Sequence, residues 1–137
     1  MYQQLVKERQ LLTDVNVYMM GDLDKSLVVA EGRLVKGVSM EEAEAAISIE
    51  LERVKTDVQE SELTKVKRKA ESSHTFGEIS NDSKALNLAY FELLGDAALC
   101  NRQTELYTAV STDQIMAVAG QIFKKENCTI LRYKAKK

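Results

Sequence analysis

Two stretches of β-type sequence enclose a long helical stretch, and this order is what most constrains the fold. Residues 13–36 have the pattern of a β-hairpin, and residues 128–134 have that of a single returning strand. Apolar and polar residues alternate from Val15 to Met19, as in a strand with one buried face, and a turn follows over residues 21–25. We therefore expect an α+β domain, with a small antiparallel sheet and helices packed on one of its faces.

The two strands of the predicted hairpin differ in their expected burial. In the first, Val17 and Met19 are expected to point inward, and Met20 is expected to fill the core at the strand end. The second, over residues 27–35, is nearly continuous in β-branched and apolar residues, which is typical of a more buried strand. Gly32 lies in its middle and predicts a β-bulge at that point.

Capping patterns mark the starts of two helices. Ser39 with Glu42, and Ser111 with Gln114, have the spacing of a capping box, in which each side chain bonds the backbone N–H of the other residue. The apolar positions that follow each box recur at helical spacing. These faces are expected to be buried: Ala43, Ala46, Ile47, Leu51 and Val54 in the first helix, and Ile115, Val118, Ala119, Ile122 and Phe123 in the second.

The remaining helices are predicted from their apolar spacing and their ends. Asp82 or Ser83 is expected to cap a helix that stops at Gly95, a residue suited to the left-handed position after a helix. Further helices are expected over residues 2–11, 60–79 and 101–109. The predicted inward positions are Leu63, Val66 and Ala70 in one helix and Leu86, Ala89, Tyr90, Leu93 and Leu94 in the next.

Composition narrows the class of protein. With 137 residues, 45 % of them apolar and no proline to mark a linker, the chain is expected to form a single domain over residues 1–137. A three-stranded sheet is thin for so many helices, so we expect that domain to be truncated.

A net charge of −2 argues against nucleic-acid binding. No apolar run is long enough for a membrane span, and no signal peptide is evident. The compartment stays open between bacterial cytoplasm, periplasm and cell envelope.

Histidine content limits the chemistry that the chain can perform. His74 is the single histidine, and Glu71 stands three residues before it on the same expected helical face. A di-iron centre needs a second such pair and two more glutamates, and the zinc motif H-x-x-E-H is missing. Cys100 and Cys128 form no C-x-x-C pattern. The residues therefore predict no catalytic residue, no cofactor site and no metal ligand in this chain.

Five phrases, taken as a set, carry a resemblance to a known family. They are LVKERQL at residues 5–11, LVVAEGRL at 27–34, VSMEEAEAAI at 38–47, ELTKVK at 62–67 and NCTILRY at 127–133. Together they resemble the C-terminal domain of the M16 zinc peptidases, the relatives of insulinase, pitrilysin and the mitochondrial processing peptidase. The match covers essentially the whole chain but only the later part of one such domain, whose opening strands are expected before Met1.

The resemblance implies a role without chemistry of its own. In that family two homologous α+β domains enclose an unfolded peptide, and H-x-x-E-H lies in the N-terminal domain. This chain is similar to the other half, so it is expected to help form the cleft wall and to be inactive alone, with zinc supplied by its partner domain. The implied partners are an N-terminal M16 domain and a peptide substrate. The sheet edge left by missing strands also favours association with a second copy.

One departure from the family keeps two alternatives open. Many members have an Arg and a Tyr, seven positions apart, that hold substrate near the zinc. Those positions align with Val6 and Thr13, and neither offers an equivalent donor. The chain could therefore belong to an inactive M16-like structural repeat, or be a free-standing helical module that binds a protein partner. A small metal enzyme centred on Glu71 and His74 ranks last.

Overall fold

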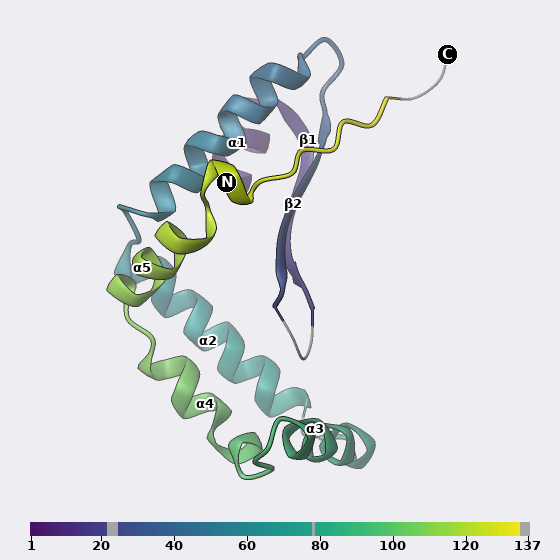
Figure 1. Cartoon of the computed structure of the whole chain (residues 1–137), viewed down its shortest axis with the longest axis vertical. Helices are drawn as coiled ribbons and strands as arrows, with labels where there is room; N and C mark the ends of the chain where they lie inside the picture. Colours follow the sequence, from purple (N-terminus) through teal and green to yellow (C-terminus); the bar gives the residue numbers. More distant parts are fainter. Residues whose placement is uncertain (22–24, 78, 135–137) are drawn as a thin grey trace. The chain divides into compact units, whose positions relative to one another are not determined.

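The chain forms an α+β structure with two compact units. The computed structural model describes residues 1–21, 25–77 and 79–134. The sheet unit comprises Met1–Thr56 and Ala119–Lys137, and the helical unit comprises Asp57–Val118. Within the described ranges no helix is long and apolar enough to cross a membrane. The element order is η1 (Gln3–Glu8), β1 (Leu12–Met20), β2 (Leu27–Leu34), α1 (Met40–Val54), α2 (Glu60–Gly77), α3 (Asn81–Leu93), α4 (Leu99–Ala109), α5 (Thr112–Ile122) and η2 (Lys125–Asn127) (Figure 1).

The predicted hairpin and the α+β class are both confirmed. Strands β1 and β2 pair antiparallel, with Leu12 opposite Leu34 at one end and Met20 opposite Leu27 at the other. The predicted turn falls mainly on residues 22–24, which lie outside the described residues. That the whole of residues 1–137 is one truncated domain stays a prediction.

The hairpin bulge lies on the opposite strand from the one that we predicted. Between Leu12 and Asp14 the first strand has one residue more than its partner, so the bulge is at Thr13 and the predicted bulge at Gly32 is wrong. Gly32 pairs regularly with Val15. A Cβ atom on Gly32 would lie 2.8 Å from Cδ1 of Leu12, so the glycine is required by the close approach of a buried side chain.

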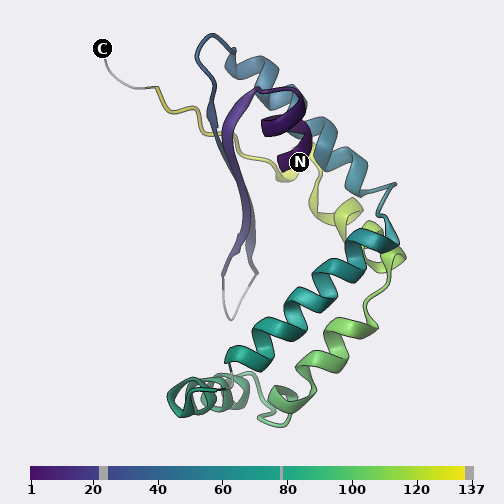
Figure 2. The same ribbon diagram turned by 180° about the vertical axis from the view of Figure 1, so that it is seen from behind.

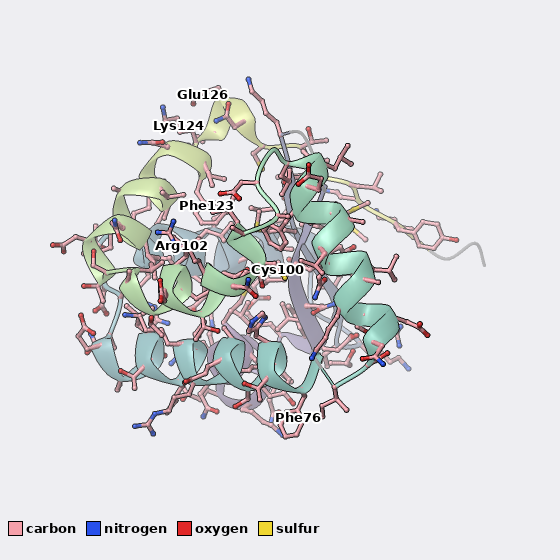
Figure 3. All side chains as sticks on the ribbon, turned by 90° about the horizontal axis from the view of Figure 1, so that it is seen from below. Phe76, Cys100, Arg102, Phe123, Lys124 and Glu126 are labelled. Atoms are coloured by element: carbon pink, nitrogen blue, oxygen red, sulfur yellow. The ribbon has the colours of Figure 1, made fainter. Side chains whose placement is uncertain are left out.

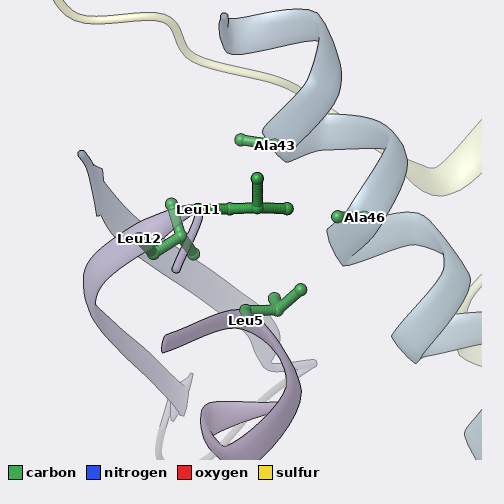
Figure 4. Packing of buried hydrophobic residues seen from close by; sticks show 5 residues of the cluster. All are labelled: Leu5, Leu11, Leu12, Ala43 and Ala46. Carbon is green, nitrogen blue, oxygen red and sulfur yellow. The ribbon is translucent and has the colours of Figure 1, made fainter. Parts of the chain in front are cut away.

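The core of the sheet unit lies at one end of the hairpin. Helix α1 and the π-helical turn η1 lie on the same side of the strands, as Figures 1 and 2 show. The predicted helix over residues 2–11 is thus shorter than expected and π-helical, and Gln10, with φ +50°, turns the chain into β1. Figure 4 shows the cluster that joins these elements, which consists of Leu5, Leu11, Leu12, Ala43 and Ala46.

The other half of the hairpin is exposed, against expectation. Val17, Met19 and Met20, which were expected to be inward, are all exposed. The alternating pattern therefore predicted the strand correctly but not its burial. The reason is that the core cluster reaches only the end of β1 near Leu12, and within the described sheet unit no buried residue belongs to the strand beyond it.

Helix α1 follows its sequence signals closely. Its N-cap is Ser39, whose Oγ accepts the backbone N–H of Glu42 at 3.1 Å, as predicted. The second bond of the predicted capping box, from the N–H of Ser39 to the Glu42 side chain, is not among the hydrogen bonds of the described residues. Ala43 and Ala46 are buried, and the other three positions expected on this face are half-buried. The predicted inward face of α1 is therefore confirmed.

The ends of the helices in the helical unit were largely predictable. Helix α2 ends at Gly77 and α4 begins at Leu99, each within two residues of the expected position. The cap of α3 is Ser80 rather than Asp82 or Ser83, because Ser80 Oγ accepts the N–H of Ser83 at 3.4 Å. Gly95, with φ +103°, ends this helix as predicted: its N–H bonds the carbonyl of Glu92 and that of Asp96 bonds the carbonyl of Phe91.

The burial expected for α3 is wrong. No residue of this helix is buried, and Leu86 is 72 % exposed although it was expected to be inward. Val66 on α2, and Val118 and Ile122 on α5, are likewise exposed. Helical spacing identifies an apolar face, but burial depends on an element that covers it. Within the described helical unit, the main packing partner of α3 is α4, and their contact is small.

The predicted third strand is not formed. After η2 the chain is extended over residues 128–134, which we call the C-terminal segment, and the described residues provide no ladder partner for it. Figure 1 shows it as an extended trace in the sheet unit. A sequence can specify an extended conformation, but a strand also requires a neighbour with free backbone groups.

Candidate functional site

The C-terminal segment is fixed to α1 by one guanidinium group. Arg132 donates from Nε to Glu44 Oε1 at 2.6 Å and from Nη2 to Glu44 Oε2 at 2.9 Å. Its Nη1 donates to Glu41 Oε1 at 2.9 Å. Glu41 and Glu44 are three residues apart and therefore share a face of the first turns of α1. The result is a bidentate pair with a third charge-assisted bond, a strong arrangement for an arginine.

The two glutamates further favour the charged form of this arginine. The hydrogen bonds and the negative charge of Glu44, followed by those of Glu41, raise the pKa of Arg132 above its ordinary value. From the sequence alone, the acidic residues in the first turns of α1 are explained by the helix dipole, because negative charge is favourable at its positive end. Their role in binding Arg132 was missed, because nothing in the local pattern indicates a partner near the other end of the chain.

The rest of the C-terminal segment is open to solvent. Leu131 is 90 % exposed and Tyr133 is 87 % exposed. Among the described residues, no backbone hydrogen bond involves residues 129–134. The segment therefore presents free N–H and C=O groups in an extended conformation, which is the condition under which another strand can pair.

An open hollow with polar and apolar lining lies within the helical unit. It has a volume of about 320 Å³ and is formed by α2, α3 and α4. A smaller hollow of about 190 Å³ adjoins it, because Asn87 lines both, and Cys100 belongs to its wall. In Figure 3 Cys100 lies inside the space enclosed by these helices and Phe76 points away from it. The lining of the larger hollow is Ala70, Ser73, His74, Gly77, Asn87, Gln103 and Tyr107.

The Glu71–His74 pair does not become a metal centre in this structure. Both residues are on α2, His74 is half-buried in the wall of the larger hollow, and Glu71 is exposed. Among the described residues, no group of three or more His, Cys, Asp or Glu side chains could hold a metal ion. The hypothesis of a small metal enzyme thus gains no additional ligands. That this chain binds no zinc of its own stays a prediction.

The two positions that depart from the family pattern have structural roles here. Val6 is partly buried against the core cluster of the sheet unit. The hydroxyl of Thr13 lies 3.1 Å from the carbonyl oxygen of Arg33, to which it donates across the bulge. One side chain is thus engaged in packing and the other in the hairpin.

The fold can now be compared with known proteins. An α+β chain that joins a hairpin to a series of helices is similar to part of a protease. One solved structure that it matches is a protease from Helicobacter pylori, with a TM-score of 0.81 and 18 % sequence identity over 91 % of this chain. The match covers 30 % of that protease chain, so this chain spans less than a third of its length. At this identity the likeness establishes the fold. No protein-family model matches the sequence, and no curated protein matches it.

Proposed function

We propose that this chain is the later part of the C-terminal, non-catalytic domain of an M16-type zinc metallopeptidase. In this role it helps enclose a peptide substrate and pairs with the domain that bears H-x-x-E-H. Zinc and the general base come from that partner domain. The chain contributes the hairpin, the helices and the segment that Arg132 holds on α1.

One observation carries the proposal. The likeness in fold spans 91 % of this chain and only 30 % of a protease chain, which is the relation expected of one part of a larger peptidase. The five phrases that resemble the M16 family extend over the same length, from residue 5 to residue 133. The fold likeness thus supports the peptidase part of the proposal, and the five phrases support its M16 part.

A second candidate function has an observation of its own. Val6 and Thr13 stand where many family members have the Arg and Tyr that hold substrate, and both are engaged in the sheet unit. This arrangement favours an inactive M16-like repeat, which would pair with an active domain as a structural element.

The reading frame upstream of the Met1 codon tests both proposals. A frame that continues into a domain with H-x-x-E-H supports the peptidase half. A frame that continues into an M16-like domain without that motif contradicts it and supports the inactive repeat. An in-frame stop directly upstream contradicts both and favours the free-standing helical module.

Metal analysis of the purified chain provides an independent test. Because the zinc ligands are assigned to the partner domain, we expect no stoichiometric zinc and no peptide cleavage by the chain alone. One tightly held zinc ion per chain would overturn the assignment.

A further inference from the structure

The hollow of about 320 Å³ in the helical unit has the chemistry of a binding site for neutral amides. Its size lies at the lower end of the range of about 300–1,000 Å³ in which small ligands bind. Two carboxamide groups, Asn87 on α3 and Gln103 on α4, come from different helices. The adjoining hollow adds a third, Asn101. Lys84 places an ammonium group in the wall of that adjoining hollow, so we call the larger hollow alone the amide groove.

The carboxamides of Asn87 and Gln103 are available to a ligand. Both side chains are half-buried, and among the described residues neither one takes part in a hydrogen bond. No buried side-chain polar atom in the described part of the chain lacks a partner, so the amide atoms of these two lining residues are accessible to solvent. Each amide offers two N–H donors and a carbonyl acceptor there.

The charge of the lining selects the class of ligand. Carboxylate, ammonium and guanidinium groups are all missing from the described lining of the larger hollow, which instead has hydroxyl, imidazole and carboxamide groups. A charged ligand would lose hydration without gaining an ion pair. A ligand with a donor and an acceptor side by side can satisfy a carboxamide at both ends. In an extended peptide the N–H and C=O groups of one residue point to the same side, so the main chain has this arrangement.

We propose that the amide groove binds the main chain of a peptide through Asn87 and Gln103. The inference rests on the proposed function, since a wall of a peptidase cleft meets unfolded peptides. The inference adds to that function the part of the chain where peptide binds and the groups through which it is bound. Main-chain recognition is independent of side-chain identity, so such a groove accepts peptides of many sequences.

The experiment uses the isotope-labelled full chain and a blocked tripeptide, N-acetyl-Ala-Ala-Ala-amide, as the probe. Titration should shift the side-chain amide resonances of Asn87 and Gln103 in nuclear magnetic resonance spectra and leave those of exposed Gln121 unchanged. An analogue with ester linkages, which lacks the peptide N–H donors, should bind more weakly. Equal binding of the ester, or no shift at Asn87 and Gln103, would overturn the proposal.

Matched variants separate recognition from folding. Gln103→Met keeps the length of the side chain but removes its hydrogen bonds, and should raise the Kd of the probe by about tenfold. Gln121→Met on α5 should leave the Kd unchanged. If Gln103→Met fails to fold, Asn87→Leu on α3 provides the same test. Equal effects of Gln103→Met and Gln121→Met would contradict the groove.

The outcomes also separate this inference from the proposed function. No probe binding together with an upstream H-x-x-E-H frame would refute the groove and leave the peptidase assignment intact. Probe binding together with an in-frame stop before Met1 would refute the peptidase assignment and leave a peptide-binding module.

Discussion

Arg132 and Glu44, 88 residues apart in the sequence, form a bidentate pair with N–O distances of 2.6 and 2.9 Å. This pair and the bond to Glu41 hold a segment that makes no backbone ladder with the described residues. Because the pKa of Arg132 is raised, its contribution to stability is present below its ordinary pKa and is lost only as the pH rises through the raised value. Arg132 therefore remains cationic at neutral pH, and salt is the practical means of weakening the contact.

Removing this guanidinium should release the C-terminal segment. Exposed Cys128 provides a site for a nitroxide label, whereas Cys100 is buried and should not react. In Arg132→Gln the label should show faster motion in electron paramagnetic resonance spectra, because neither glutamate retains a cationic partner on the segment. Salt at about 0.5 M should move the spectrum of the unmutated chain toward that of the variant.

The control for this experiment is a weak surface pair elsewhere. Arg102 lies 3.9 Å from Glu105 on α4, and both side chains are largely exposed. Arg102→Gln should therefore leave the spectrum of the Cys128 label unchanged. A label that moves equally in both variants would show that Arg132 does not hold the segment.

Two glycine substitutions should have opposite effects on stability. In Gly32→Ala the new methyl group would lie 2.8 Å from Cδ1 of Leu12 and 3.1 Å from the carbonyl oxygen of Asp14. Because Leu12 belongs to the core cluster and cannot easily move, we expect a loss of about 1–3 kcal/mol in the free energy of unfolding. Urea denaturation measures the change.

Gly120→Ala provides the matched comparison. A Cβ atom at this position in α5 would meet no atom within 4 Å. Alanine should therefore raise the free energy of unfolding by about 0.5–1 kcal/mol through its higher helix propensity. Destabilisation by both substitutions to the same extent would contradict the steric role of Gly32.

The two serine caps of the helical unit should differ in strength. At the start of α5, Ser111 Oγ accepts the N–H of Gln114 at 3.2 Å and Gln114 Oε1 accepts the N–H of Ser111 at 2.9 Å. The capping box is thus complete, whereas Ser80 makes a single bond of 3.4 Å. Ser111→Ala should lower the free energy of unfolding by about 1 kcal/mol, and Ser80→Ala by less. A larger loss in Ser80→Ala would show that bond length and reciprocity do not rank these caps.

The sequence predicted local structure better than burial. Ser39, Ser111 and Gly95 act at helix ends as their patterns indicate, because caps depend on residues within one turn. Leu86 and Met19 were placed inward by the same periodicities and are exposed, because burial depends on segments distant in the sequence or outside it. The fold class was therefore predictable, whereas the extent of the core was not.

The candidate sites, like the buried core, depend on residues that are not neighbours in the sequence. His74 was singled out for metal chemistry, yet it lies with Asn87 and Gln103 in the lining of the larger hollow. Asn87 and Gln103 lie on the two helices that follow that of His74, and neither residue belongs to a recognisable sequence motif. Likewise, no pattern near Glu44 indicates Arg132. Sites made by the packing of distant segments require the structure.

The free edges and exposed face of the hairpin predict self-association of the chain. Each of its two strands has one edge without a ladder partner among the described residues, and Met19 on β1 is 68 % exposed. Edge strands with apolar side chains pair readily with other chains, and a lysine on the edge opposes this pairing. Sedimentation equilibrium of the unmutated chain should therefore give a mass that rises with concentration above 15.4 kDa.

In Met19→Lys the mass should fall toward the monomer value. Ile79→Lys, which changes a side chain that is 75 % exposed in the helical unit, should leave the association unchanged, because Ile79 lies outside the sheet. Equal loss of association in both variants would assign it to general apolar exposure, and a monomer at every concentration would exclude pairing through the hairpin edge.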